Sequence, residues 1–360
     1  MTRAGLRICL IASARFPVAE PFAGGLEAHT HLLASELVRR GHQVSLFAGP
    51  GSDPALPVTE LSVGPFRDSA GGHGPAGSDP DEWMREHHAY LHLMAGLGRD
   101  GHHRFDVIHN NSLHHLPVAM AAAVRVPMLT SLHTPALPWL ESAIELAPPD
   151  SVFVAVSTAT RAAWSHVVDA RVVTNGVDTV RWALGPGGPA AVWSGRIVPE
   201  KAPHEAIDAA RAAGLNLRLA GPILDHDYFA REVERRLGPD VSYVGHLDQR
   251  TLCAVVGTSR VALVTPDWDE PYGLVAAEAM ACGTPVAAYA RGGLPEVVGT
   301  AGGRLARAGD VLDLARAVTE ASDLDRTEVR AAVLGRASVS RMVDDYVAIY
   351  DELSARKAAA

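Results

Sequence analysis

Two carboxylates with a fixed spacing, Glu270 and Glu278, occur in the stretch that covers residues 261–298. The first lies in a polar loop, and the second lies about one turn inside an Ala-rich helix that Leu274 begins. Burying a carboxylate is costly unless its oxygens are used, and two adjacent ribose hydroxyls are a suitable bidentate partner. The alternative is that Glu278 faces water, and the helix pattern by itself does not decide between the two.

The same helix and a second strand end offer partners for a diphosphate. The first amides of the helix, at 273–275, have no acceptors within it and can donate to phosphate oxygens. Arg196 follows Gly195 at the end of another predicted strand, and Lys201 stands just before the next helix. Two cations there would neutralise a diphosphate without a metal, and surface salt bridges are the alternative. Only two of the 32 basic residues are lysines, which favours a functional role for Lys201.

Three further strand ends carry candidate residues. Gly24 and Gly25 open a helix after the first strand, where their amides can approach a diphosphate, although a tight turn would also explain them. His133 ends a strand, where it can donate to a sugar hydroxyl or a phosphate oxygen or merely cap that strand. His246 and Leu247 end another strand, at a place where a base could stack.

Two histidine-containing motifs have metal-ligand spacing. His88 and His92 stand four residues apart on the predicted helix 82–97, but no intervening Glu completes a zinc-protease motif, and exposed histidines are the ordinary case. The motif DHD at 225–227 has the spacing of a metal-binding acidic pair, which the two cations would make redundant. No G-x-G-x-x-G fingerprint follows the first strand. We therefore expect no metal and no cofactor.

These residues need parallel sheets to bring them together. Strand, loop, helix and strand follow one another in both halves of the chain, and ligands of such sheets lie beyond the carboxyl ends of the strands. A chain of 360 residues exceeds one ordinary core, so two domains are predicted. The Gly- and Pro-rich run 185–189 is the predicted linker, between domains at 1–184 and 190–340. A second such run, at 64–80, would suit a flap over an acceptor but is interpreted as an inert loop.

Composition excludes several classes of function. The net charge of −9 argues against nucleic acid, whose binding needs a concentrated basic footprint. No apolar run approaches the roughly 20 residues of a membrane helix. Arg7 interrupts the N-terminal apolar stretch, which we interpret as a strand and not as a signal peptide. Cys9, Cys253 and Cys282 are far apart in the sequence, without metal or redox spacing, which favours a reducing cytoplasm. Nothing in the pattern indicates an oligomeric state.

In combination, these motifs resemble one family of enzymes. The glycine pair at 24–25, GR at 195–196 with Lys201, GHL at 245–247 and EPYGLVAAE at 270–278 look like those of the retaining glycosyltransferases of family 4. The resemblance covers nearly the whole chain and is strongest in its second half. It implies an α/β fold of the GT-B type, with two Rossmann-like domains facing across a cleft. It also implies that a C-terminal helix at 341–360 crosses back to complete the first domain.

The resemblance further implies roles for individual residues. Glu278 would bind the ribose hydroxyls, Arg196 and Lys201 the diphosphate, Glu270 the sugar hydroxyls, and His133 the transferred sugar. The expected catalytic set is His133, Arg196, Lys201 and Glu270. The expected donor-binding set is Gly24, Gly25, Gly195, His246, Leu247, Tyr272, Gly273, Leu274, Val275 and Glu278.

The expected reaction moves a hexose from a nucleotide diphosphate sugar to a small soluble acceptor, with retention and without a metal. The stretches LAGPILDHDYF and VGHLD look most like small bacterial enzymes of the UDP-glucose type, so UDP-glucose or a related UDP-sugar is the expected donor. A GT-B sugar-nucleotide epimerase or phosphorylase is one alternative, and a non-catalytic nucleotide-sugar-binding protein is another. The acceptor does not follow from the motifs.

Overall fold

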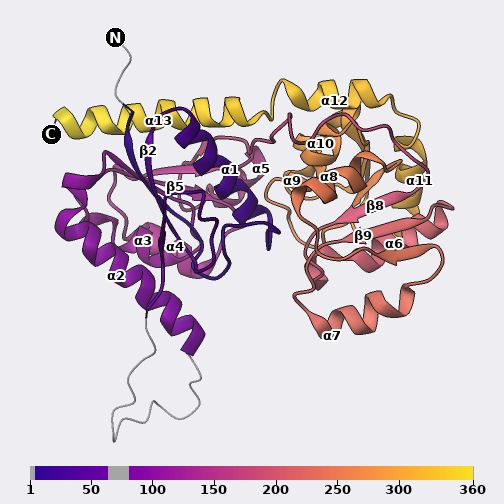
Figure 1. The fold of residues 1–360 in the computed structure, drawn as a ribbon, viewed down its shortest axis with the longest axis horizontal. Coiled ribbons are helices and arrows are strands. Elements are labelled where there is room, and N and C mark those ends of the chain that lie inside the picture. Colours follow the sequence, from indigo (N-terminus) through magenta and orange to yellow (C-terminus); the bar gives the residue numbers. More distant parts are fainter. Residues whose placement is uncertain (1–4, 64–80, 360) are drawn as a thin grey trace, which may run out of the picture.

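The computed structural model describes residues 5–63 and 81–359, so the predicted loop at 64–80 lies outside the described residues. Two α/β domains are visible, each with helices packed around one parallel sheet (Figure 1). The predicted fold class is confirmed.

The first domain contains a sheet with the strand order β3-β2-β1-β4-β5-β6-β7, in which every pairing is parallel. Its strands are β1 (Arg7–Ile11), β2 (Gln43–Ala48), β3 (Val58–Glu60), β4 (Val107–Asn110), β5 (Met128–Leu132), β6 (Val152–Ala155) and β7 (Arg171–Val172). Its α-helices are α1 (Gly25–Arg39), α2 (Asp81–Arg104), α3 (His115–Ala119), α4 (Pro138–Glu145) and α5 (Thr158–Trp164). A 3₁₀ turn, η1 (Ala121–Ala123), follows α3.

The second domain repeats this arrangement with the order β10-β9-β8-β11-β12-β13. Its strands are β8 (Ala191–Ser194), β9 (Leu217–Ala220), β10 (Val241–Tyr243), β11 (Ala262–Val264), β12 (Val286–Tyr289) and β13 (Gly303–Ala306). Its α-helices are α6 (Pro203–Ala212), α7 (His226–Tyr228), α8 (Gln249–Gly257), α9 (Leu274–Ala281), α10 (Leu294–Gly302), α11 (Val311–Ala321) and α12 (Arg326–Leu334). Short turns complete it: η2 (Pro199–Lys201), η3 (Phe229–Val233) and η4 (Glu234–Arg236).

The strand order determines where ligands can bind. In each sheet the chain first adds strands on one side of the first strand and then crosses to its other side. This reversal of direction lies between β1 and β4 in the first sheet and between β8 and β11 in the second. Such a switch point leaves a crevice at the carboxyl ends of the two strands. The central strands are buried on both faces, β5 and β12 along their whole length, so the sheets are rigid supports for the loops that follow them.

The terminal helix α13 (Val339–Ala359) returns from the second domain and lies along the first (Figure 1). Its apolar side chains Met342, Tyr346 and Tyr350 are buried in the core that also contains Leu33 and Leu37 of α1. The predicted crossing of the C-terminal helix is confirmed. No helix in the described ranges, 5–63 and 81–359, is long and apolar enough to cross a membrane.

The motif NGVD at 175–178 contacts the segment that leads into α13. Val177 pairs with Ser338 in a parallel bridge, next to the point where the chain enters that helix. Gly176 permits this approach, because a Cβ atom there would lie 2.7 Å from Cα of Val339. The glycine therefore serves a close contact between two crossing segments.

Candidate active site

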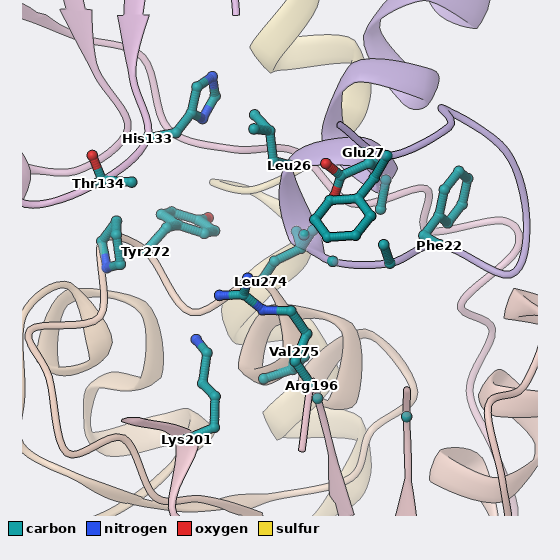
Figure 2. Close-up of a pocket in the computed structure, with 18 of the residues that line it drawn as sticks. Phe22, Leu26, Glu27, His133, Thr134, Arg196, Lys201, Tyr272, Leu274 and Val275 are labelled. Carbon is teal, nitrogen blue, oxygen red and sulfur yellow. The ribbon is translucent and has the colours of Figure 1, made fainter. Parts of the chain in front are cut away.

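The carboxyl edges of the two sheets enclose a cavity of about 680 Å³, with walls from both domains (Figure 2). Its lining includes all the candidate residues of the sequence: Gly24, Gly25, His133, Gly195, Arg196, Lys201, His246, Leu247, Glu270, Tyr272, Gly273, Leu274, Val275 and Glu278. These residues meet because the carboxyl ends of parallel strands share one edge of a sheet.

Arg196 follows β8 and points into the cavity near Leu274 (Figure 2). Its side chain is partly buried, and no ion pair or hydrogen bond reaches its guanidinium from the described part of the chain. The guanidinium is also close to the start of α1, because a Cβ atom at Gly24 would lie 3.6 Å from Cδ of Arg196. An unpaired guanidinium in a cavity is well suited to bind an anion.

Lys201 and Glu270 form an ion pair inside the same cavity. Nζ of Lys201 lies 2.5 Å from Oε2 of Glu270, which also accepts a hydrogen bond of 3.2 Å from Nε1 of Trp268. The side chains of the pair are only 20% and 14% exposed, so this is not the surface salt bridge that the sequence left open. The pair connects η2 to the loop before α9 and fixes both groups at the edge of the cavity.

The N-terminus of α9 faces the cavity with free amides. Gly273 has φ of +94°, a left-handed conformation, and precedes the first helical residue Leu274. No acceptor within the described residues takes the amide hydrogens of Leu274 and Val275. These amides and the positive end of the helix dipole can therefore bind phosphate oxygens.

We expect Gly273→Ala to lower the free energy of unfolding by about 1–3 kcal/mol and to weaken binding of a phosphorylated ligand at the start of α9. The left-handed backbone disfavours a side chain, and the added Cβ would lie 2.5 Å from Cδ2 of the buried Leu294. Gly214→Ala is the matched control, because Gly214 has φ of +70° but no atom within 4 Å of a Cβ. Chemical denaturation and calorimetry would measure both effects. Equal changes in the free energy of unfolding and in ligand affinity in the two variants would contradict the prediction.

Glu278 is buried, 8% exposed, on the side of α9 that lines the cavity. The alternative that it faces water is therefore wrong. No hydrogen bond to its carboxylate comes from the residues that the structure describes. Burial, together with the charge of Cys253, raises the pKa of Glu278 to about 8. Such an uncompensated carboxyl group is costly for the fold, and a ligand that donates hydrogen bonds would relieve that cost.

The cysteines differ from the sequence-based expectation. Cys253 on α8 and Cys282 at the end of α9 are separated by 29 positions, yet their Sγ atoms lie 3.7 Å apart. Both are free thiols. The separation of the two cysteines in the sequence did not predict their proximity, because α8 and α9 pack against each other in one core.

The start of α1 faces the start of α9 across the cavity. A Cβ atom at Gly25 would lie 3.8 Å from Cδ2 of Leu274. Gly24 is extended, with φ of −169°, so the glycine pair does not form a left-handed turn. Glu27, in the first turn of α1, also lines the cavity at 5% exposure, and burial raises its pKa. Glu27 was not among the predicted site residues, although an acid two positions after a glycine pair was a visible signal in the sequence.

His133 follows β5 and is turned toward other polar groups of the first domain. Its Nε2–H donates to Oδ1 of Asn111 over 2.7 Å, and its ring packs edge-on against His29. Burial, with smaller effects of His29 and His109, holds the pKa of His133 well below its ordinary value. The ring is therefore neutral at pH 7, with Nδ1 as its remaining acceptor.

His246 connects the two domains at another part of the cavity. Its ring Nε2 lies 2.8 Å from the carbonyl oxygen of Phe22, in the loop before α1. At a second contact, Ser157, which caps α5, and Thr160 of α5 donate to the carbonyl oxygen of Pro271, over 2.5 and 2.9 Å. These contacts hold the domains together around the cavity.

The motif at 225–227 has a structural role in the fold. The Asp225 carboxylate caps α7 by accepting a hydrogen bond of 2.8 Å from the amide of Tyr228. No group of three His, Cys, Asp or Glu side chains that could hold a metal ion occurs within 5–63 and 81–359.

The fold consists of two Rossmann-like domains with a cavity between the carboxyl edges of their sheets, and comparisons identify the family. The model of "Glycosyltransferase Family 4" matches residues 23–181, and that of "Glycosyl transferases group 1" matches residues 180–336. Together they cover most of the chain. The protein therefore belongs to the family 4 type of GT-B glycosyltransferases and is a hexosyltransferase.

Individual relatives agree with this assignment. A glycogen synthase of Mycobacterium tuberculosis is 29% identical, over 90% of this chain and 87% of its own. A D-inositol 3-phosphate glycosyltransferase of Mycolicibacterium smegmatis is 27% identical, over 98% and 94%. The structure of Anabaena HepE in complex with UDP-glucose superposes with a TM-score of 0.74 at 18% identity, covering 96% of this chain and all of that one.

Proposed function

We propose that the enzyme moves a hexose from a UDP-sugar, UDP-glucose or a close relative, to a hydroxyl group of a small acceptor. The transfer retains the anomeric configuration and needs no metal. The observation that carries this proposal is the unpaired Arg196 beside the free amides of α9, with the buried Glu278 one turn further along. One end of this arrangement suits a diphosphate, and the other suits a ribose. The UDP-glucose complex of the similar HepE supports the choice of donor.

In this proposal the cations and amides act on the leaving group. The diphosphate gains negative charge as the bond to the sugar breaks, and Arg196, Lys201 and the amides at the start of α9 stabilise that charge. Lys201, paired with Glu270, and the amides of α9 are held in place before the ligand arrives, so these groups need little reorganisation during the reaction. Glu270, fixed by Lys201, accepts hydrogen bonds from the hydroxyls of the transferred sugar.

The transfer itself occurs on one face of the sugar. The bond between the anomeric carbon and the phosphate oxygen breaks, and its electron pair remains on that oxygen. The acceptor oxygen forms the new bond on the same face, and its proton passes to the departing phosphate. No side chain becomes a covalent intermediate, and His133 orients the sugar from the first domain.

Thermal unfolding with UDP, GDP, ADP and their glucose conjugates tests the donor assignment. We expect stabilisation by UDP and UDP-glucose, worth about 2.7 kcal/mol at 100 times the Kd, because only the folded state binds them. Addition of EDTA should leave this stabilisation unchanged. Stabilisation by another nucleotide alone would refute the UDP assignment, and its loss in EDTA would refute metal independence. UDP release only when an acceptor is present would distinguish transfer from an epimerase.

A further inference from the structure

An aromatic wall lines the first-domain side of the cavity. We use this name for Trp83, Tyr90, His114, His115 and Trp139, all of which line the cavity. They come from α2, from the start of α3 and from the start of α4. None of them belongs to the residues assigned above to the donor.

Most rings of the wall stack on one another. Tyr90 and His115 each stack on His114, with a centroid distance of 4.5 Å in both pairs. His87 connects this stack to Trp83, with centroid distances of 5.5 Å to His115 and 5.3 Å to Trp83. The series of ring contacts therefore extends from the buried Tyr90 to the half-exposed Trp83.

The tryptophans of the wall are unusually open to solvent. Trp83 is 51% exposed and Trp139 is 54% exposed, and both belong to the cavity lining. Exposing two large aromatic surfaces in one concave site forgoes hydrophobic stabilisation that burial would provide. Exposed apolar surface in a cavity is typical of ligand contact.

The wall carries little charge. Burial, with smaller effects of His115 and His87, lowers the pKa of His114 to about 3, and the pKa values of His87 and His115 are also lowered, mainly by burial. These rings are therefore neutral at pH 7. The nearby Arg15 of the cavity lining forms an ion pair with Glu86, with 3.5 Å between Nη2 and Oε2. Among the residues that the structure describes, the rings of the wall therefore carry no positive charge of their own, and the neighbouring Arg15 is paired with Glu86, which disfavours binding of a phosphate there.

We propose that the aromatic wall binds the acceptor, and that this acceptor is an uncharged molecule with a flat apolar face beside its hydroxyl group. The face is either an aromatic ring or the C–H face of a sugar ring. The inference rests on the proposed function, because it assigns the second substrate of the same reaction. It disfavours a sugar phosphate as the acceptor, although several relatives are named for an inositol phosphate.

Calorimetric titration of the wild-type enzyme saturated with UDP tests the substrate class. The probes are phenyl β-D-glucoside, methyl β-D-glucoside and glucose 6-phosphate. We expect at least one glucoside to bind about 10-fold more tightly than glucose 6-phosphate. Tighter binding of the phenyl glucoside than of the methyl glucoside supports an aromatic face, and the opposite result or equality supports a sugar face. Glucose 6-phosphate binding as tightly as both glucosides, or no binding of either glucoside, overturns the proposal.

Variants of the two tryptophans test the location. Trp83→Ala and Trp139→Ala should each weaken binding of the favoured glucoside about 10-fold, and Trp83→Phe should retain most of the affinity. Leu312→Ala is the control, because Leu312 is 71% exposed outside the cavity. UDP affinity should be unchanged in all four variants. Unaltered glucoside affinity in both Trp→Ala variants would overturn this inference alone, whereas absence of UDP binding by the wild type would refute the proposed function.

Discussion

Replacing Arg196 by Ala is expected to lower kcat about 100- to 1,000-fold while leaving the free energy of unfolding almost unchanged. The loss of rate follows from the charge that the leaving diphosphate gains in the transition state. The stability should change little, because no described residue forms an ion pair or a hydrogen bond with the guanidinium, which acts on the buried Glu27 only through its charge. UDP release with saturating UDP-glucose and the favoured glucoside, together with chemical denaturation, would measure the two quantities.

Two comparisons make the Arg196 result specific. Arg307→Ala removes an exposed guanidinium of the same domain, 75% exposed, and should leave kcat unchanged. Lys201→Ala should also reduce kcat, but it leaves the partly buried Glu270 without its cation and should therefore destabilise the protein as well. Near-wild-type kcat in Arg196→Ala would remove the basis for the diphosphate site.

Much of the fold followed from local signals around α9. The helix was predicted to begin at Leu274, and this agrees with the structure. Apolar runs bounded by glycine and proline define such buried elements clearly. By contrast, β3 has three residues at a sheet edge, too few for a pattern. The start of α8 was missed although its signal was present, since Asp248 caps the helix by accepting from the amide of Thr251.

The candidate site was predictable as a set of residues but not as a set of contacts. Parallel strands bring their carboxyl ends together, so the candidates from both halves gather in one cavity. Which side chains pair there depends on packing. The ion pair of Lys201 and Glu270 spans 69 positions, and no local pattern connects those two residues. The aromatic wall was missed for the same reason, because its rings come from three separate helices.

Glu278 allows the sharpest test of the donor site, because ionisation of its carboxyl group should strengthen donor binding but lower the free energy of unfolding. Its pKa is about 8 in the folded protein, against an ordinary value of 4.5, and burial is the main cause. Between these values the folded state binds more protons than the unfolded state, so the free energy of unfolding falls as the pH rises, by about 1.4 kcal/mol per unit at most. The stabilisation that the protonated Glu278 contributes is complete below pH 4.5 and is lost as the pH rises through about 8.

Glu278→Gln should remove that pH dependence, because the amide does not titrate. The variant is therefore expected to become more stable than the wild type as the pH approaches 8, in scanning calorimetry without ligand. Glu328→Gln, an exposed substitution on α12, is the control and should follow the wild type.

Donor binding should change in the opposite direction. Two ribose hydroxyls donate to an ionised carboxylate, so the wild type should bind UDP-glucose more tightly at pH 8 than at pH 6.5 and release a proton on binding. Glu278→Gln should bind UDP-glucose about 100-fold more weakly, without proton release, because hydrogen bonds to a charged acceptor are lost. Titration calorimetry in two buffers of different ionisation enthalpy measures both effects. A variant that gains stability but keeps its affinity would show that Glu278 is a buried acid without a role at the ribose.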